Sequence, residues 1–448
     1  MPVLRRTPFL RVLAVGVAAA GTLTGAAVAG PAAGASTAAS GAGSATATAH
    51  GAAGPVSDCL TLASPTCYSP QEFRTAYGIQ PLTDRGITGR GETVVMPEFA
   101  ATPGEPGITD VRRDIARYDS VFRLPAAHLR VITALAPGSS PFQAPGEYAG
   151  DVEIVHAIAP RAAIRVILIP ADVSFALGVR DFSAALRMAP SLGSVVSITQ
   201  GGFNESCLTS AQVATVHSAL RFDRERHVTV AVASGDFGAE GQPCTATPTP
   251  ARAVVFPASD PLALTVGGTS LDASHRTGAH IGETVWNRPV SGLPGVVASG
   301  GGFSRDFARP AYQTGLRGIG ASRGVPDVAS DADPNTGIAF VEAAGSQFGI
   351  YPAGGTSAGA PVWAGIAAVA DQYAGRHLGF INPAIYEIGR DARYHRAFHD
   401  VTKGNNTVQV GSVTVKGFDA GHGWDPVTGW GSPNAQVLIP LLARYVTG

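Results

Sequence analysis

A glycine turn followed by a run of small residues places Ser357 at the start of a predicted helix, within the segment from Gly354 to Gly365. Alanines and glycines let such a helix pack closely against a sheet. Its first-turn amides and positive dipole end then face whatever the serine attacks. This arrangement is typical of a nucleophilic hydroxyl. Because a free serine is a poor nucleophile, a neighbouring base must accept its proton.

The base for this serine is predicted to be a carboxylate, because no Asp-Thr-Gly or His-Gly-Thr-His motif supplies an Asp and a His. Glu147 and Asp151 are four residues apart in a helical segment, so they share one face. Ile154 and Ile158 continue that face towards the core. Glu153 falls on the opposite side, where we expect a solvated acid.

Burial and mutual repulsion raise the pKa of at least one carboxyl in such a pair. Glu147 and Asp151 are therefore expected to share a proton in mild acid. One carboxylate can then accept the Ser357 proton while its partner orients it. The alternative is a solvent-exposed first turn, in which the acids only favour the helix dipole.

A third acid, Asp236, follows the predicted strand Val228–Ala233 and lies between two glycines, Gly235 and Gly238. The carboxyl ends of parallel strands are where α/β sheets place their sites. A protonated Asp236 could donate a hydrogen bond to a developing oxyanion, and the loss of one such donor typically costs ~10²–10³ in rate. The alternative is an ordinary turn aspartate.

Short apolar runs alternate with helical stretches, which predicts an α/β fold of three layers with a mainly parallel central sheet and helices on both faces. The predicted strands are Thr93–Pro97, Ile164–Ile169, Val195–Thr199, Val228–Ala233, Ala253–Phe256 and Ala263–Val266. The predicted helices are Ile108–Val121, Glu147–Ala159, Phe182–Met188, Ser210–Arg224 and Ala358–Ala374.

The composition is that of a globular protein with a large core. Of 448 residues, 45% are hydrophobic and 15% charged, and the formal net charge is -1. These values argue against a disordered chain and against a nucleic-acid-binding protein.

The first residues are predicted to be a targeting segment. Three arginines precede an apolar stretch from Val12 to Gly30 that ends in small residues. This pattern predicts a secretory signal peptide over residues 1–29. A membrane anchor is the alternative, although the stretch is mostly alanine and glycine. Residues 30–58 are predicted to form a flexible Ala/Gly/Ser/Thr-rich linker, and residues 59–448 one domain.

The four cysteines are predicted to form two disulfides, because export allows disulfides and proximity in sequence favours Cys59–Cys67 and Cys207–Cys244. The alternative is unpaired buried thiols. No cysteine lies beside a histidine with the spacing of metal ligands, which argues against zinc.

Together, the serine, acid-pair and aspartate motifs resemble those of the sedolisins, the serine-carboxyl peptidases, in order and spacing. The resemblance runs from about residue 68 to residue 444 and implies a subtilisin-like fold. Further matching segments are Tyr68–Gly78, Ser299–Ser304, Pro326–Val328 and Asp331–Pro334. The resemblance implies these roles: nucleophile Ser357, general base Glu147, orienting acid Asp151 and oxyanion acid Asp236.

Glu98 lies where some members of this family carry an outer glutamate that extends the hydrogen-bond chain. The chain departs from the family in two places. Gln200 stands where some relatives have a tryptophan that braces this glutamate, although a glutamine amide can also hydrogen-bond to it. The family usually carries a folded prodomain where this chain has only the linker. We therefore expect the chain to fold unaided or with the help of another protein.

The same resemblance implies one structural calcium ion near the C-terminus. Carboxylate and carbonyl oxygens are the ligands that calcium prefers. The expected carboxylate ligands are Asp400 and Asp425, and the expected carbonyl ligands are Val401, Gly421 and Gly423. Without the resemblance these segments would be interpreted as an Asx turn and a glycine loop.

The sequence thus predicts a secreted, extracellular endopeptidase that acts in acid on proteins or peptides. We expect a monomer that binds no nucleic acid and, after signal removal, no membrane. One alternative is a lipase or esterase of the α/β-hydrolase type, because Gly355–Gly359 also fits the nucleophile elbow. Such an enzyme would need a downstream histidine, and His395, His399 and His422 are available. A second alternative is an inactive binding module with the same fold.

Two further residues are predicted to be structural. Ser270 lies in a second Gly-Gly-Thr-Ser segment, but no helix of small residues follows it. His156 lies off the face that carries the acid pair.

Overall fold

The computed structural model describes residues 58–61, 66–101, 108–170, 175–199, 202–241, 250–289, 296–344 and 347–446. The predicted signal peptide, the linker up to residue 57, Gln200 and Cys244 lie outside these residues. No helix in the described part is both long and apolar enough to cross a membrane.

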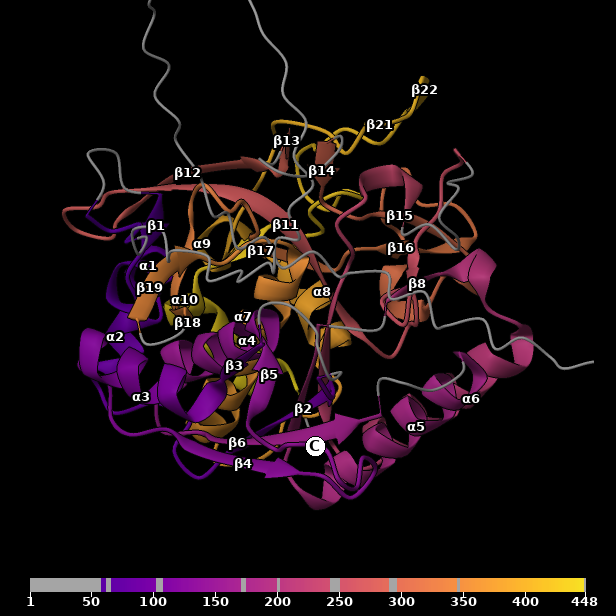
Figure 1. Ribbon diagram of the computed structural model, residues 1–448. Coiled ribbons are helices and arrows are strands. Elements are labelled where there is room, and N and C mark those ends of the chain that lie inside the picture. Colours follow the sequence, from indigo (N-terminus) through magenta and orange to yellow (C-terminus); the bar gives the residue numbers. More distant parts are fainter. Residues whose placement is uncertain are drawn as a thin grey trace, which may run out of the picture.

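The centre of the fold is a mainly parallel sheet, in which eight strands belong to the described residues. Their order is β12-β11-β9-β7-β2-β6-β4, and β17 also pairs with β11 (Figure 1). Only β12 runs antiparallel to its neighbour among these pairs. The bounds are β2 Thr93–Phe99, β4 His128–Ile132, β6 Ala163–Ile169, β7 Val195–Ile198, β9 Thr229–Ala233, β11 Leu264–Ala273, β12 His280–Val285 and β17 Val328–Asp331.

Helices cover both faces of this sheet. Figure 1 shows α4 (Gly146–Ile158) beside α7 (Thr356–Ala374), and α5 (Phe175–Met188) beside α6 (Ser210–Arg224) on the opposite face. Alternate residues of β2 separate accordingly, since Val94 packs into the core with α4 and α7 while Val95 packs with α5 and α6. The α/β prediction with helices on both faces is therefore confirmed.

Small residues allow α7 to lie close to its neighbours. A Cβ atom on Gly359 would lie 2.9 Å from Val266 of the sheet. A Cβ atom on Gly365 would lie 2.6 Å from Ile158 of α4. The close packing expected for this helix is thus present, and it joins the two helices that carry the predicted serine and acid pair.

Three predicted segments differ from the structure. The helix predicted over Phe182–Met188 begins earlier, as α5 (Phe175–Met188). Residues 108–110 form a short strand, β3 (Ile108–Asp110), and helix α3 (Val111–Phe122) begins after it. The Asp110 side chain caps the helix by accepting from the Arg112 amide at 3.0 Å. The run Ala253–Phe256 contains β10 (Val255–Phe256), which pairs antiparallel with β8 (Phe203–Asn204) outside the central sheet.

The expectation that Glu153 is solvated is wrong. Glu153 is 0% exposed, and its Oε2 accepts a 2.7 Å hydrogen bond from the Val341 amide. The reason is a small sheet of β1 (Cys67–Tyr68), β18 (Gly337–Ala344) and β19 (Gln347–Pro352), of which β18 packs against α4. This sheet covers the side of α4 that the helical pattern assigns to solvent.

The predicted Cys59–Cys67 disulfide is present, with Cα atoms 5.6 Å apart. Cys207 is also disulfide-bonded, and its predicted partner Cys244 lies outside the described residues.

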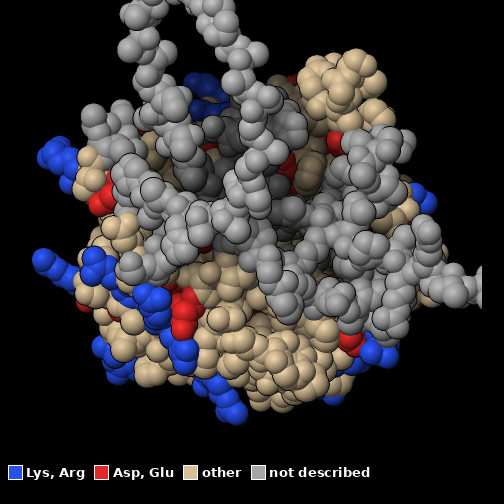
Figure 2. Space-filling model, in the orientation of Figure 1, with Lys and Arg blue, Asp and Glu red and all other residues tan. Residues whose placement is uncertain are grey.

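On the face drawn in Figure 2, basic and acidic side chains are scattered among other residues, with several basic side chains along one edge.

Candidate active site

The predicted site residues meet at the carboxyl ends of three neighbouring strands, β9, β7 and β2. Asp236 follows β9, Thr199 follows β7, and Glu98 is the penultimate residue of β2. The first turns of α4 and α7 bring Glu147 and Ser357 to the same edge. Residues far apart in sequence thus come together because parallel strands end on one side of a sheet.

Ser357 lies in the first turn of α7 and is 5% exposed. Gly355 precedes the helix with φ +80°, a left-handed conformation that favours glycine. A Cβ atom on Gly355 would lie 2.6 Å from Asp236 Oδ2. A side chain at position 355 would therefore displace Asp236, which explains why the serine follows a glycine turn.

Glu147 faces Ser357. The Ser357 hydroxyl hydrogen-bonds to the Glu147 carboxyl. Removal from water raises the pKa of Glu147, the serine hydrogen bond lowers it, and the charge of Asp236 raises it. Glu147 Oε1 is shielded from solvent and has no hydrogen-bond partner among the described residues. The serine hydroxyl thus points to a carboxyl whose basicity burial increases.

Asp151 lies one turn further along α4 and is 2% exposed. The Thr199 hydroxyl donates to Asp151 Oδ2 at 2.6 Å and lies 3.5 Å from Glu98 Oε1. Burial raises the pKa of Asp151 well above its usual range, and the charges of Glu98 and Glu147 add to this, while Thr199 lowers it. The three carboxyls therefore form one titrating group that cannot hold three negative charges.

Asp236 is fixed by Thr356, the residue before the serine. The Thr356 amide and hydroxyl both donate to Asp236 Oδ1 at 2.8 Å. Burial raises the pKa of Asp236, and these two hydrogen bonds oppose the rise. A carboxyl with a raised pKa can remain protonated in acid and act as a donor.

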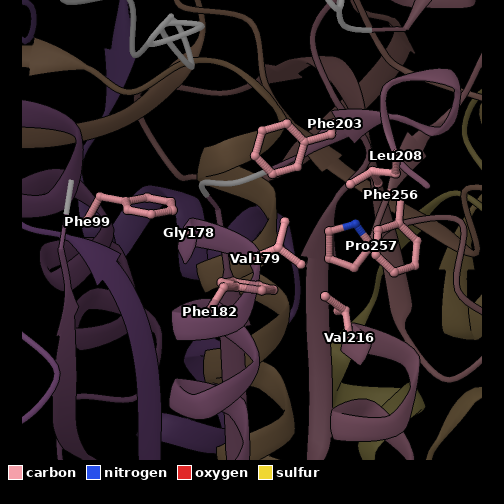
Figure 3. A pocket seen from close by; sticks show the side chains of 9 residues that line it. All are labelled: Phe99, Gly178, Val179, Phe182, Phe203, Leu208, Val216, Phe256 and Pro257. Carbon is pink, nitrogen blue, oxygen red and sulfur yellow. The ribbon is translucent and has the colours of Figure 1, made fainter. Parts of the chain in front are cut away.

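An apolar pocket adjoins the end of β2. Figure 3 shows the side chains of Phe99, Val179, Phe182, Phe203 and Phe256 among those that line it. Gly178, Leu208, Val216 and Pro257 complete its lining. Phe99 directly follows Glu98, so the pocket begins next to the acids and extends between α5, α6 and the β8–β10 ribbon.

The residues expected to bind calcium gather around one turn. The Gly423 amide donates to Asp400 Oδ1 at 3.2 Å, and the Gly421 amide donates to Asp425 Oδ2 at 3.1 Å. Val401 is buried beside Asp400. The two carboxylates and the three backbone carbonyls are hard oxygen donors, which fit calcium. No group of three or more His, Cys, Asp or Glu side chains in the described ranges could hold a metal ion, so such a site would depend on carbonyl oxygens.

The downstream histidines contact other residues. His399 stacks on His280, with ring centroids 3.7 Å apart. His422 Nδ1 lies 3.3 Å from Asp400 Oδ2. The ring of His395 packs against the ring of Tyr394. The three imidazoles that an α/β-hydrolase would use thus contact residues other than Ser357.

The two residues predicted to be structural have structural contacts. The Ser270 hydroxyl donates to Asp333 Oδ2 at 2.7 Å. His156 Nε2 lies 2.9 Å from both Pro125 O and Asp119 Oδ1. These contacts join the helix that carries Glu147 and Asp151 to α3 and to the segment after it.

Sequence reasoning gave no role to Thr199 or Thr356. Thr199 is the last residue of the predicted strand Val195–Thr199, so its place at the carboxyl end of a strand was the available signal. Thr356 precedes the predicted nucleophile, but nothing in the sequence relates it to Asp236, which is 120 residues away.

Comparison with known proteins found relatives over most of the chain, although no protein-family model matches it. The chain is similar to Kumamolisin of Bacillus sp. (strain MN-32), with 32% identity over 398 residues that cover 85% of this chain and 65% of that protein. It is also similar to Sedolisin of Pseudomonas sp. (strain 101), with 28% identity over 406 residues that cover 88% of this chain and 64% of that protein. The chain thus spans just under two thirds of the length of these relatives.

A solved structure shares the fold. It is that of Pseudomonas sedolisin, a serine-carboxyl proteinase complexed with two molecules of pseudo-iodotyrostatin. The TM-score is 0.71 at 24% sequence identity, and the match covers 88% of this chain and 100% of that chain. The predicted subtilisin-like fold is confirmed by this likeness, and the sequence similarities support the sedolisin family.

Proposed function

We propose that this chain is a serine-carboxyl peptidase of the sedolisin family, an endopeptidase that hydrolyses peptide bonds in proteins or peptides. The observation that carries the proposal is the hydrogen bond between the Ser357 hydroxyl and the Glu147 carboxyl. A serine activated by a carboxylate distinguishes this reaction from that of enzymes that use an imidazole.

In the proposed reaction, Ser357 Oγ attacks the carbonyl carbon of the peptide bond and Glu147 takes the hydroxyl proton. Asp151, held by Thr199, orients Glu147. The C–N bond then breaks, Glu147 returns the proton to the leaving amine, and an acyl-enzyme remains. Water hydrolyses this ester by the same path, with Glu147 again taking the proton.

Asp236 acts as the oxyanion donor in this proposal. It must be protonated to donate, and burial raises its pKa, which favours the protonated form in acid. The group of Glu98, Asp151 and Glu147 must still hold one negative charge, and the Ser357 hydrogen bond favours this charge on Glu147. Activity is therefore expected in acid and is expected to fall near neutrality.

Three further features belong to the same proposal. Asp400, Asp425 and the carbonyl oxygens of Val401, Gly421 and Gly423 would hold one structural calcium ion, which would stabilise the C-terminal region. The enzyme is exported by its N-terminal segment. It acts as a monomer.

A lipase or esterase of the α/β-hydrolase type is a weaker candidate, because His395, His399 and His422 have other contacts and Glu147 would have no role. An inactive module would keep the fold without turnover. Replacing each of the three histidines separates the first alternative from the peptidase. If Glu147 is the base, peptide turnover should be unaffected by each replacement.

The experiment that tests the proposal is cleavage of an internally quenched peptide over a pH series by the parent and by Ser357→Ala. We expect activity in acid from the parent and none from the variant. Ser270→Ala is the matched control, since it alters the serine of the second Gly-Gly-Thr-Ser segment. Equal activity of Ser357→Ala and the parent, or a rate maximum in alkali, would contradict the assignment.

A further inference from the structure

Two polar atoms beside the candidate site are buried and have no hydrogen-bond partner in the described part of the chain. They are the hydroxyl oxygen of Tyr148 and Oε2 of Glu98. Tyr148 is 1% exposed and Glu98 is 0% exposed. A buried polar group without a partner is costly, so each of these atoms calls for an explanation.

The fold brings the two side chains to the same place. Tyr148 lies three residues before Asp151 on α4, so both project from neighbouring positions on one side of the helix. Asp151 is joined through the Thr199 hydroxyl to Glu98 Oε1, at 2.6 Å and 3.5 Å. Glu98 therefore directs one oxygen to Thr199 and has the other, Oε2, available for a second donor.

The chemistry of the two groups is complementary. A phenol is a hydrogen-bond donor, and a carboxylate oxygen is an acceptor. The charge of Glu98 acts on Tyr148 and, together with burial, raises the pKa of the phenol, which therefore keeps its proton. Burial and the charge of Glu147 raise the pKa of Glu98 well above its usual range.

From this juxtaposition we propose that Tyr148 is a positioning residue, whose hydroxyl donates to Glu98 Oε2 through one buried water. Through Glu98 and Thr199 this interaction reaches Asp151, whose pKa the charge of Glu147 raises, and Glu147 is the carboxyl that faces Ser357. The inference rests on the proposed peptidase function. The role of Tyr148 is to hold Glu98 in place and to stabilise the negative charge that Glu98, Asp151 and Glu147 share.

The test compares Tyr148→Phe, which removes only the hydroxyl, with Tyr118→Phe. Tyr118 is a matched control, because its hydroxyl is also buried without a partner among the described residues but lies on α3 near Glu153. For Tyr148→Phe we expect kcat to fall about tenfold with KM little changed. Losing a donor to the shared charge favours protonation, so the acid limb of the pH profile should move to higher pH.

A double variant makes the test specific. In a Glu98→Gln background, adding Tyr148→Phe should cause little further loss, because the two groups act through one interaction. Wild-type kcat and pH profile in Tyr148→Phe would overturn the proposal. An equal effect of Tyr118→Phe on kcat would also overturn it. The same holds if the double variant loses kcat by the product of the two single losses.

A crystal structure of the parent provides a second test, which does not depend on enzymatic turnover. The proposal requires one ordered water that is hydrogen-bonded to both Tyr148 Oη and Glu98 Oε2. Separate partners for the two atoms would overturn it. If the parent cleaves no peptide, the peptidase function fails, and this geometry still decides whether Tyr148 holds Glu98.

Discussion

Thr356 donates two hydrogen bonds to the same oxygen of Asp236, from its amide and its hydroxyl, each 2.8 Å from Oδ1. Because Oδ1 accepts both, a proton on this carboxyl belongs on Oδ2. Oδ2 is the oxygen that approaches the backbone of Gly355, two residues before Ser357. The residue next to the candidate nucleophile thus selects which oxygen of Asp236 can donate.

This geometry predicts the effect of Thr356→Val, which removes the hydroxyl and keeps the amide. The lost bond favours the charged form of Asp236, so its removal raises the pKa of Asp236 further. The alkaline limb of kcat should therefore move to higher pH by about one unit. Thr269→Val is the control, because that hydroxyl donates to Glu283 instead, at 2.8 Å. An unchanged or lowered alkaline limb in Thr356→Val would count against Asp236 as the titrating donor.

Replacing Asp236 itself separates its two properties. Asp236→Ala removes the donor, and we expect kcat to fall by ~10²–10³. Asp236→Asn keeps an N–H donor that does not titrate, so it should lose less activity and should lack the alkaline limb of the parent. Both outcomes follow from kcat measured across the pH series. If the Asn variant retains the parent's alkaline limb, another group controls it.

Local signals predicted several helices and strands of the fold. Helix α6 occupies the predicted range Ser210–Arg224, because Thr209 and Gln212 form a capping box at its start. The predicted strands of the central sheet are present because they are continuous apolar runs. Small residues predicted close packing of helix α7, and Gly359 and Gly365 lie close to the sheet and to α4.

Contacts between distant segments could not be predicted in the same way. The pattern of α4 assigns Glu153 to solvent, because nothing in that helix indicates that β18 will cover it. The pairing of Thr356 with Asp236, and the position of Thr199 between two acids, depend on which strands become neighbours. A single threonine has no spacing pattern of its own. The roles of Thr199 and Thr356 are therefore visible only once the sheet is assembled.

An ion pair on α6 predicts a pH-dependent contribution to stability. His217 Nδ1 lies 2.7 Å from Asp260 Oδ2, and this hydrogen bond raises the pKa of His217, while burial and nearby Arg221 oppose the rise. The stabilisation is therefore complete below the unfolded-state pKa of about 6.5 and is lost as pH rises through the folded-state pKa. Because His217 is partly exposed, we expect less than about 1 kcal/mol. Chemical unfolding of the parent and His217→Gln should differ at pH 5 and converge at pH 9; a constant difference would argue against the ion pair.

A buried ion pair predicts a large loss of stability. Arg323 and Asp327 are both 0% exposed, with Nη2 2.6 Å from Oδ2, and the Tyr386 hydroxyl donates to Asp327 Oδ1 at 2.7 Å. Arg323→Met would leave an uncompensated buried carboxylate, and we expect the free energy of unfolding to fall by about 3–5 kcal/mol. Arg393→Met is the control, since that arginine pairs with Asp391 near the surface. Similar unfolding curves for both variants would show that the buried pair is not essential.

Calcium removal tests the C-terminal loop by stability alone. If Asp400 and Asp425 bind one calcium ion in the folded state only, a concentration one hundred times Kd should stabilise that state by about 2.7 kcal/mol. A chelator should therefore lower Tm, and added calcium should restore it. Asp425→Asn keeps an oxygen that can accept from the Val427 and Thr428 amides, at 2.9 Å and 2.8 Å in the parent, but it removes one negative charge from the loop. This variant should lose most of the calcium dependence of Tm, whereas Asp419→Asn, an exposed change nearby, should keep it. A parent whose Tm ignores both chelator and calcium has no such ion, and the loop would then be held by its own hydrogen bonds.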